Sequence, residues 1–153
     1  MWDKFGGTEY DVSDFLNLIF SYSDVIEGIT FLGGEPLEQV ESVAEIAKSV
    51  RQKGLSVLVF TGYKYEDIKD KPECVKLLKN TDILIDGKYE EALKDLSRPW
   101  VGSSNQNYYF LTDRYDKNII NEYKNRFELH FDKTNKVVAN GMGDYEKLAK
   151  IIK

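Results

Sequence analysis

Three short, largely apolar runs alternate with stretches of helical periodicity in this chain. The runs cover residues 29–32, 55–60 and 83–85. Short continuous strands between helices are typical of a parallel sheet, because helices cover its faces. The alternation therefore predicts an α/β fold with a mostly parallel sheet.

Helices are expected between these strands. Asp11 is a suitable N-cap for a helix whose apolar residues recur at helical spacing through Phe20. Pro36 suits the first turn of a second helix, which Lys53 and Gly54 end. A third helix is expected over residues 73–80. The remaining chain predicts strands over 107–111, 127–131 and 136–139 and a closing helix over 144–152.

Composition limits the classes of partner. The formal net charge of −5 argues against a broad nucleic-acid interface, which needs a basic face. No apolar run approaches the roughly 20 residues that cross a bilayer, so no membrane partner is expected. The N-terminus has no apolar signal-peptide core, which predicts a cytoplasmic protein. The single cysteine, Cys74, excludes an internal disulfide and an all-cysteine metal site within one chain.

Three turns follow the predicted parallel strands. They are Gly33-Gly34-Glu35-Pro36, Thr61-Gly62-Tyr63 and Asp86-Gly87. Ligands of parallel sheets gather at the carboxyl ends of the strands. The turns offer backbone groups, a carboxylate, a hydroxyl and an aromatic ring, which suit a small polar ligand with an ammonium group and an adenine-like ring. Taken alone, the double glycine more often marks a tight strand-to-helix connection.

The segment from Gly28 to Leu37 resembles the glycine-glycine-glutamate-proline segment of radical S-adenosylmethionine enzymes. Four further blocks, one before this segment over residues 2–9 and three after it over residues 60–63, 82–89 and 102–106, stand in the order found in the activating enzymes of this family. The resemblance is strongest to the branch that activates anaerobic ribonucleotide reductase. Five ordered blocks are far more specific than any one of them.

The resemblance implies a fold, cofactors and a partner. The fold would be one truncated, partial (β/α) barrel that lacks its first strand, with a core over residues 1–111 and a C-terminal β/α extension over 112–153. The cofactors would be S-adenosylmethionine and a [4Fe-4S] cluster. Together they would generate a glycyl radical on an anaerobic ribonucleotide reductase or another glycyl-radical protein.

The resemblance also implies site residues. Gly33, Gly34 and Glu35 would lie against the amino group of the methionine moiety. Thr61 and Tyr63 would line the same cavity. Further round the rim would lie residues from two later blocks, namely Asp86, Ser104 and Asn105. No catalytic residue and no metal ligand is assigned.

The chain departs from the family pattern at the cluster. The family holds its cluster with three cysteines in a loop before the segment that matches Trp2 to Gly7, and Cys74 lies on a predicted helix instead. We therefore expect a semi-buried Cys74 and a chain that is inactive as it stands. The alternative is a cluster-free relative that acts as a nucleotide-like ligand-binding or protein-interaction module. Val101 stands where many relatives have arginine, so no anion contact is expected there.

The absence of a first strand, which the resemblance implies, would also affect the sheet. It would leave an unpaired edge beside residues 29–32, and such edges recruit other strands. We expect the C-terminal strands to cover this edge, or a homodimer to form through it.

Overall fold

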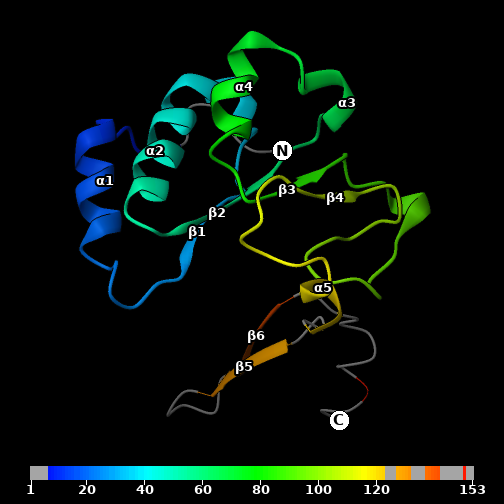
Figure 1. Cartoon of the computed structure of the whole chain (residues 1–153). Coiled ribbons are helices and arrows are strands. Elements are labelled where there is room, and N and C mark those ends of the chain that lie inside the picture. Colours follow the sequence, from blue (N-terminus) through cyan, green and yellow to red (C-terminus); the bar gives the residue numbers. More distant parts are fainter. Residues whose placement is uncertain (1–6, 123–126, 132–136, 142–149, 151–153) are drawn as a thin grey trace. The chain divides into compact units, whose positions relative to one another are not determined.

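The computed structural model describes residues 7–122, 127–131, 137–141 and 150. Figure 1 shows the course of the chain through its helices and strands. In order, these elements are α1 (Val12–Phe20), β1 (Gly28–Phe31), the 3-10 turn η1 (Pro36–Gln39), α2 (Val40–Gln52), β2 (Ser56–Phe60), α3 (Tyr65–Ile68), α4 (Pro72–Leu78), β3 (Ile83–Asp86), the 3-10 turn η2 (Glu91–Leu93), β4 (Asn107–Phe110), α5 (Ile119–Glu122), β5 (Phe127–Phe131) and β6 (Val137–Gly141).

The chain forms two compact units, which are described separately. The first comprises Met1–Lys88 and Asn107–Asp116, and the second comprises Tyr89–Gln106 and Lys117–Lys153. The expected single domain, with its boundary after residue 111, stays a prediction. None of the helices within the described ranges is long and apolar enough to span a bilayer.

The sheet of the first unit has the strand order β1-β2-β3-β4. β1 pairs with β2 in parallel, with Gly28 opposite Ser56, and β2 pairs with β3 in parallel, with Leu58 opposite Ile83. β4 pairs with β3 in the antiparallel sense. The predicted α/β fold with a mostly parallel sheet is confirmed. That this sheet belongs to a (β/α) barrel of the radical S-adenosylmethionine type stays a prediction.

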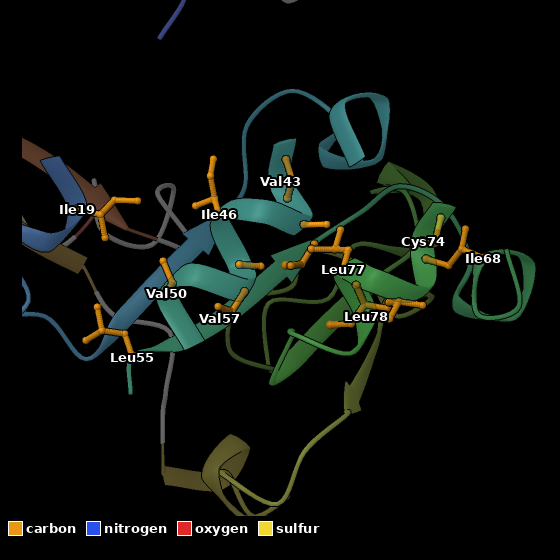
Figure 2. Packing of buried hydrophobic residues seen from close by; sticks show 14 residues of the cluster. Ile19, Val43, Ile46, Val50, Leu55, Val57, Ile68, Cys74, Leu77 and Leu78 are labelled. Atoms are coloured by element: carbon orange, nitrogen blue, oxygen red, sulfur yellow. The ribbon is translucent and has the colours of Figure 1, made fainter. Parts of the chain in front are cut away.

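Helices α1, α2 and α4 lie side by side along the sheet (Figure 1). Figure 2 shows apolar side chains of α2 in one buried cluster with Leu77 and Leu78 of α4 and Val57 of β2. The helical spacing of α2 places its apolar residues on one face, and the helix stops where Gly54 adopts a φ of +81°. Cys74 is only 3% exposed within this core, so it is fully rather than partly buried. Burial raises the pKa of its thiol.

The predicted strands at 127–131 and 136–139 are observed as β5 and β6, which pair with each other in a separate antiparallel sheet. The expectation that C-terminal strands cover the edge of β1 is therefore wrong for the described strands. Strands β5 and β6 are close in sequence, so they pair at a small loop-closure cost. In the part of the chain that the structure describes, β1 pairs only with β2. The homodimer stays a prediction, and the closing helix at 144–152 lies outside the described residues except for Lys150.

Candidate functional site

The three turns that follow β1, β2 and β3 meet at one end of the sheet, because these strands are parallel. Glu35 joins the first turn to the second. Its Oε1 accepts hydrogen bonds from the Thr61 hydroxyl at 2.8 Å and the Leu37 amide at 3.1 Å. Its Oε2 accepts from the Gly62 amide at 2.8 Å. The structure thus brings together the predicted site residues Glu35 and Thr61.

The backbone at Gly33 and Gly34 is open to the surroundings. Both glycines are exposed, and a Cβ atom added to either would meet no other atom within 4 Å. Gly34 has a φ of +60°, a backbone conformation that residues other than glycine rarely adopt. A ligand can therefore approach the backbone of this turn closely.

Tyr63 makes a second link between the two turns. Its hydroxyl donates to Oε1 of Glu38 at 3.0 Å, and its amide donates to the Thr61 hydroxyl at 3.2 Å. The hydrogen bond to Glu38 and the charge of that carboxylate raise the pKa of Tyr63. The side chain is 41% exposed, so its ring keeps a surface for a ligand.

The third turn has a different arrangement. Asp86 is only 2% exposed. Its Oδ2 accepts from the Tyr65 amide at 2.7 Å, and its Oδ1 accepts from the amide and the side-chain nitrogen of Asn107 at 3.2 and 3.1 Å. Asp86 therefore fixes the loop after β2 and the start of β4 with its carboxylate.

Two residues near this end of the sheet were not predicted as site residues. Glu38 was missed because its contact with Tyr63 depends on the pairing of β1 with β2. Lys88 packs against Gly62, where an added Cβ would lie 3.1 Å from Cγ of Lys88 and 3.5 Å from Oε2 of Glu35. The signal for Lys88 was its position in the sequence block over residues 82–89.

The predicted residues Ser104 and Asn105 belong to the second unit. The Ser104 amide donates to the Leu93 carbonyl at 2.8 Å, and the Asn105 side chain donates to Glu90 at 3.1 Å. Arg98 organises this loop by donating to the carbonyl oxygens of Ser103 and Gln106. Val101 is fully buried within the protein.

Residues 1–109 match the protein family described as the 4Fe-4S single cluster domain. The chain belongs to this family and, within it, to the radical S-adenosylmethionine activating enzymes.

Individual relatives agree with this class. The chain is 37% identical to the anaerobic ribonucleoside-triphosphate reductase-activating protein of Enterobacteria phage T4 over 92 residues, which are 58% of this chain and 56% of that protein. It is 37% identical to the protein of the same name from Escherichia coli K12 over 84 residues, or 52% of this chain and 53% of the relative. The pyruvate formate-lyase-activating enzyme of Clostridium pasteurianum is 30% identical over 89 residues, 55% of this chain and 35% of that enzyme. The chain thus matches about half the length of the reductase-activating proteins. No solved structure gives a significant match.

The residues of this chain do not fit a [4Fe-4S] cluster. Such clusters are held mainly by cysteine thiolates. The sequence has one cysteine, and Cys74 is buried in α4. Within residues 7–122 and the other described ranges, no group of three or more histidine, cysteine or carboxylate side chains could hold a metal ion.

Proposed function

We propose that the turns after β1 and β2 bind S-adenosylmethionine. Gly33 and Gly34 would hold the ammonium end of its methionine moiety with their backbone carbonyls, and the charge of the Glu35 carboxylate beside them favours a cation. The exposed ring of Tyr63 offers a face for the adenine, and Thr61 lines the same site. The observation that carries the proposal is the open backbone of the double glycine beside a loop that Glu35 ties in place.

We propose other roles for the remaining predicted site residues. Asp86 supports the site by holding Tyr65, since its carboxylate already accepts hydrogen bonds from within the protein. Ser104 and Asn105 are proposed as cofactor contacts on the resemblance alone.

The proposed biological role is activation of a glycyl-radical protein, such as an anaerobic ribonucleotide reductase, by a barrel of the radical S-adenosylmethionine type. The names of the phage T4 and Escherichia coli relatives support this kind of partner. The residues present do not supply the thiolates of a cluster. We therefore propose that this chain by itself binds the cofactor but does not generate the radical.

Calorimetric titration with S-adenosylmethionine tests the binding site, and Gly33→Val is the variant to compare. A Cβ atom added at Gly33 meets no protein atom within 4 Å, so the fold should tolerate the substitution, but the methyl groups of valine would occupy the space that the ligand needs. We expect affinity to fall by at least about tenfold, the effect of about 1.4 kcal/mol. Gly7→Val is the matched control, since Gly7 is equally open and lies outside the site. Equal affinity of Gly33→Val and the wild type would contradict the proposal.

The alternative is a cluster-free module that binds a nucleotide-like ligand or a protein without catalysis. The burial of the single thiol, Cys74, favours it. Iron and sulfide analysis after anaerobic reconstitution tests what both functions require, namely that this chain by itself holds no cluster. Stoichiometric iron and sulfide would contradict both of them.

A further inference from the structure

The carboxylate of Glu35 is occupied by donors from the protein itself. The Leu37 amide belongs to the same turn, but the Thr61 hydroxyl and the Gly62 amide belong to the loop after β2. Glu35 is half-buried and Thr61 is only 6% exposed, so water competes weakly for these bonds. The Glu35 side chain therefore joins its own turn to a loop that is distant in the sequence, since Thr61 and Gly62 lie 26 and 27 residues after it.

The geometry requires a glutamate at this position. Glutamine offers one carbonyl oxygen, and its amide group would direct N–H donors at the Gly62 amide or, after a flip, at the Leu37 amide. Aspartate is one methylene shorter and cannot keep both ends of the contact. Only a carboxylate on this length of side chain accepts all three hydrogen bonds.

Thr61 connects Glu35 to the rest of the loop after β2 through hydrogen bonds. Its hydroxyl donates to Glu35 and accepts from the Tyr63 amide, so the start of the Tyr63 segment depends on the same contact. At its outer end the loop is held by the hydrogen bond between Tyr63 and Glu38. Two sets of contacts thus fix the distance between the two turns. Glu35 makes the inner set, and the pair of Tyr63 and Glu38 makes the outer one.

We propose that Glu35 is a positioning residue, which fixes the gap between the turn at Gly33-Gly34 and the loop at Thr61-Gly62. The ligand's amino-acid end meets the open glycine backbone, and Glu35 acts on it through the placement of the second loop. This role rests on the proposed function and deepens it. It makes Thr61 a determinant of affinity even though its hydroxyl is turned to Glu35.

The test compares Thr61→Val, Thr61→Ser, Glu35→Ala and the Glu35→Ala/Thr61→Val double variant, with Glu45→Gln as the control for loss of an exposed charge on α2. Each protein is titrated with S-adenosylmethionine and with 5′-methylthioadenosine, which lacks the amino-acid end. We expect Thr61→Val to weaken S-adenosylmethionine binding about tenfold, as expected for a lost hydrogen bond to a charged group. Thr61→Ser should restore it to within about twofold. Binding of 5′-methylthioadenosine should weaken in Thr61→Val as well, because the displaced loop carries the Tyr63 ring that faces the adenine.

The outcomes separate positioning from direct contact. On the Glu35→Ala background, Thr61→Val should have no further effect on affinity. If Thr61→Val binds like the wild type while Glu35→Ala does not, Glu35 touches the ligand directly and the proposal is overturned. Losses that multiply in the double variant would also overturn it. Should Glu35→Ala fail to fold, the titration of Thr61→Val with 5′-methylthioadenosine still decides, because a direct contact of Thr61 with the amino-acid end would leave that affinity unchanged.

Amide hydrogen exchange at Gly62 tests the contact without a ligand. We expect faster exchange in Glu35→Ala and Glu35→Gln than in Glu45→Gln, and unchanged exchange would overturn the proposed tie. A wild-type protein that does not bind S-adenosylmethionine would overturn the proposed function, and with it the ligand-positioning role. Amide exchange at Gly62 would then still show whether the hydrogen bond between Gly62 and Glu35 exists.

Discussion

Arg51 and Asp82 form an ion pair at the amino ends of the parallel strands, with 2.5 Å between Nη1 and Oδ1. The Asp82 side chain is fully buried and also accepts from the Thr112 hydroxyl at 2.5 Å and the Val57 amide at 2.9 Å. One carboxylate therefore joins the end of α2, the second strand and the segment after β4.

Asp82→Asn should destabilise the protein strongly. The amide nitrogen of asparagine cannot accept a hydrogen bond, so one of the three bonds is lost, and Arg51 loses the opposite charge of its partner. Breaking a buried pair of this kind costs about 3–5 kcal/mol, and the 27% exposure of Arg51 places the expectation at about 3 kcal/mol. Urea unfolding measures the loss, with Glu45→Gln as an exposed control. A loss below about 1 kcal/mol, the net contribution of one ordinary hydrogen bond, would contradict this role.

Gly28→Ala should also destabilise the fold. A Cβ atom on Gly28 would lie 1.9 Å from Oγ and 2.3 Å from the backbone oxygen of Ser56. Serine could rotate away, but the backbone oxygen belongs to the neighbouring strand, so the pairing of β1 and β2 must shift. Overpacking of this kind costs about 1–3 kcal/mol, which thermal or urea unfolding detects. Gly7→Ala is the control, because an added Cβ there meets no atom within 4 Å, and equal losses in both variants would disprove the steric argument.

The sequence predicts the strands and their turns well, because apolar runs, Pro36 and Gly54 act locally. It does not predict the contact of Glu35 with Thr61 or that of Tyr63 with Glu38, because these residues are 26 and 25 apart and meet only through strand pairing. Asp86 was identified from its position after the strand predicted over residues 83–85, but the groups that donate hydrogen bonds to it come from elsewhere in the chain. The expectation that the C-terminal strands cover the β1 edge was wrong, because a strand's sequence does not specify its neighbour.

Asp86→Asn should loosen the third turn. Its amide nitrogen would face either the Tyr65 amide or Asn107, so a donor would point at a donor. A buried group left without its partner costs about 1–3 kcal/mol, measurable by urea unfolding. The pKa of Tyr109 gives a second reading. Burial raises it first and the charge of Asp86 raises it further, so the variant should lower this pKa while leaving it above the ordinary value. An unchanged pKa of Tyr109 would contradict the proximity of the two side chains.

The contact of Tyr63 with Glu38 should weaken in alkaline solution. The hydrogen bond and the charge of Glu38 raise the pKa of Tyr63 above its ordinary value of 10.0. The phenol donates only when protonated, so the contact is complete below the pKa of the unfolded chain and is lost as pH rises through the folded pKa. Titration of Tyr63 by NMR should show a higher pKa in the wild type than in Glu38→Gln, because glutamine removes the charge. Glu45→Gln should leave it unchanged. If Glu38→Gln titrates like the wild type, Glu38 does not hold the outer end of this loop, and Glu35 must hold the loop alone.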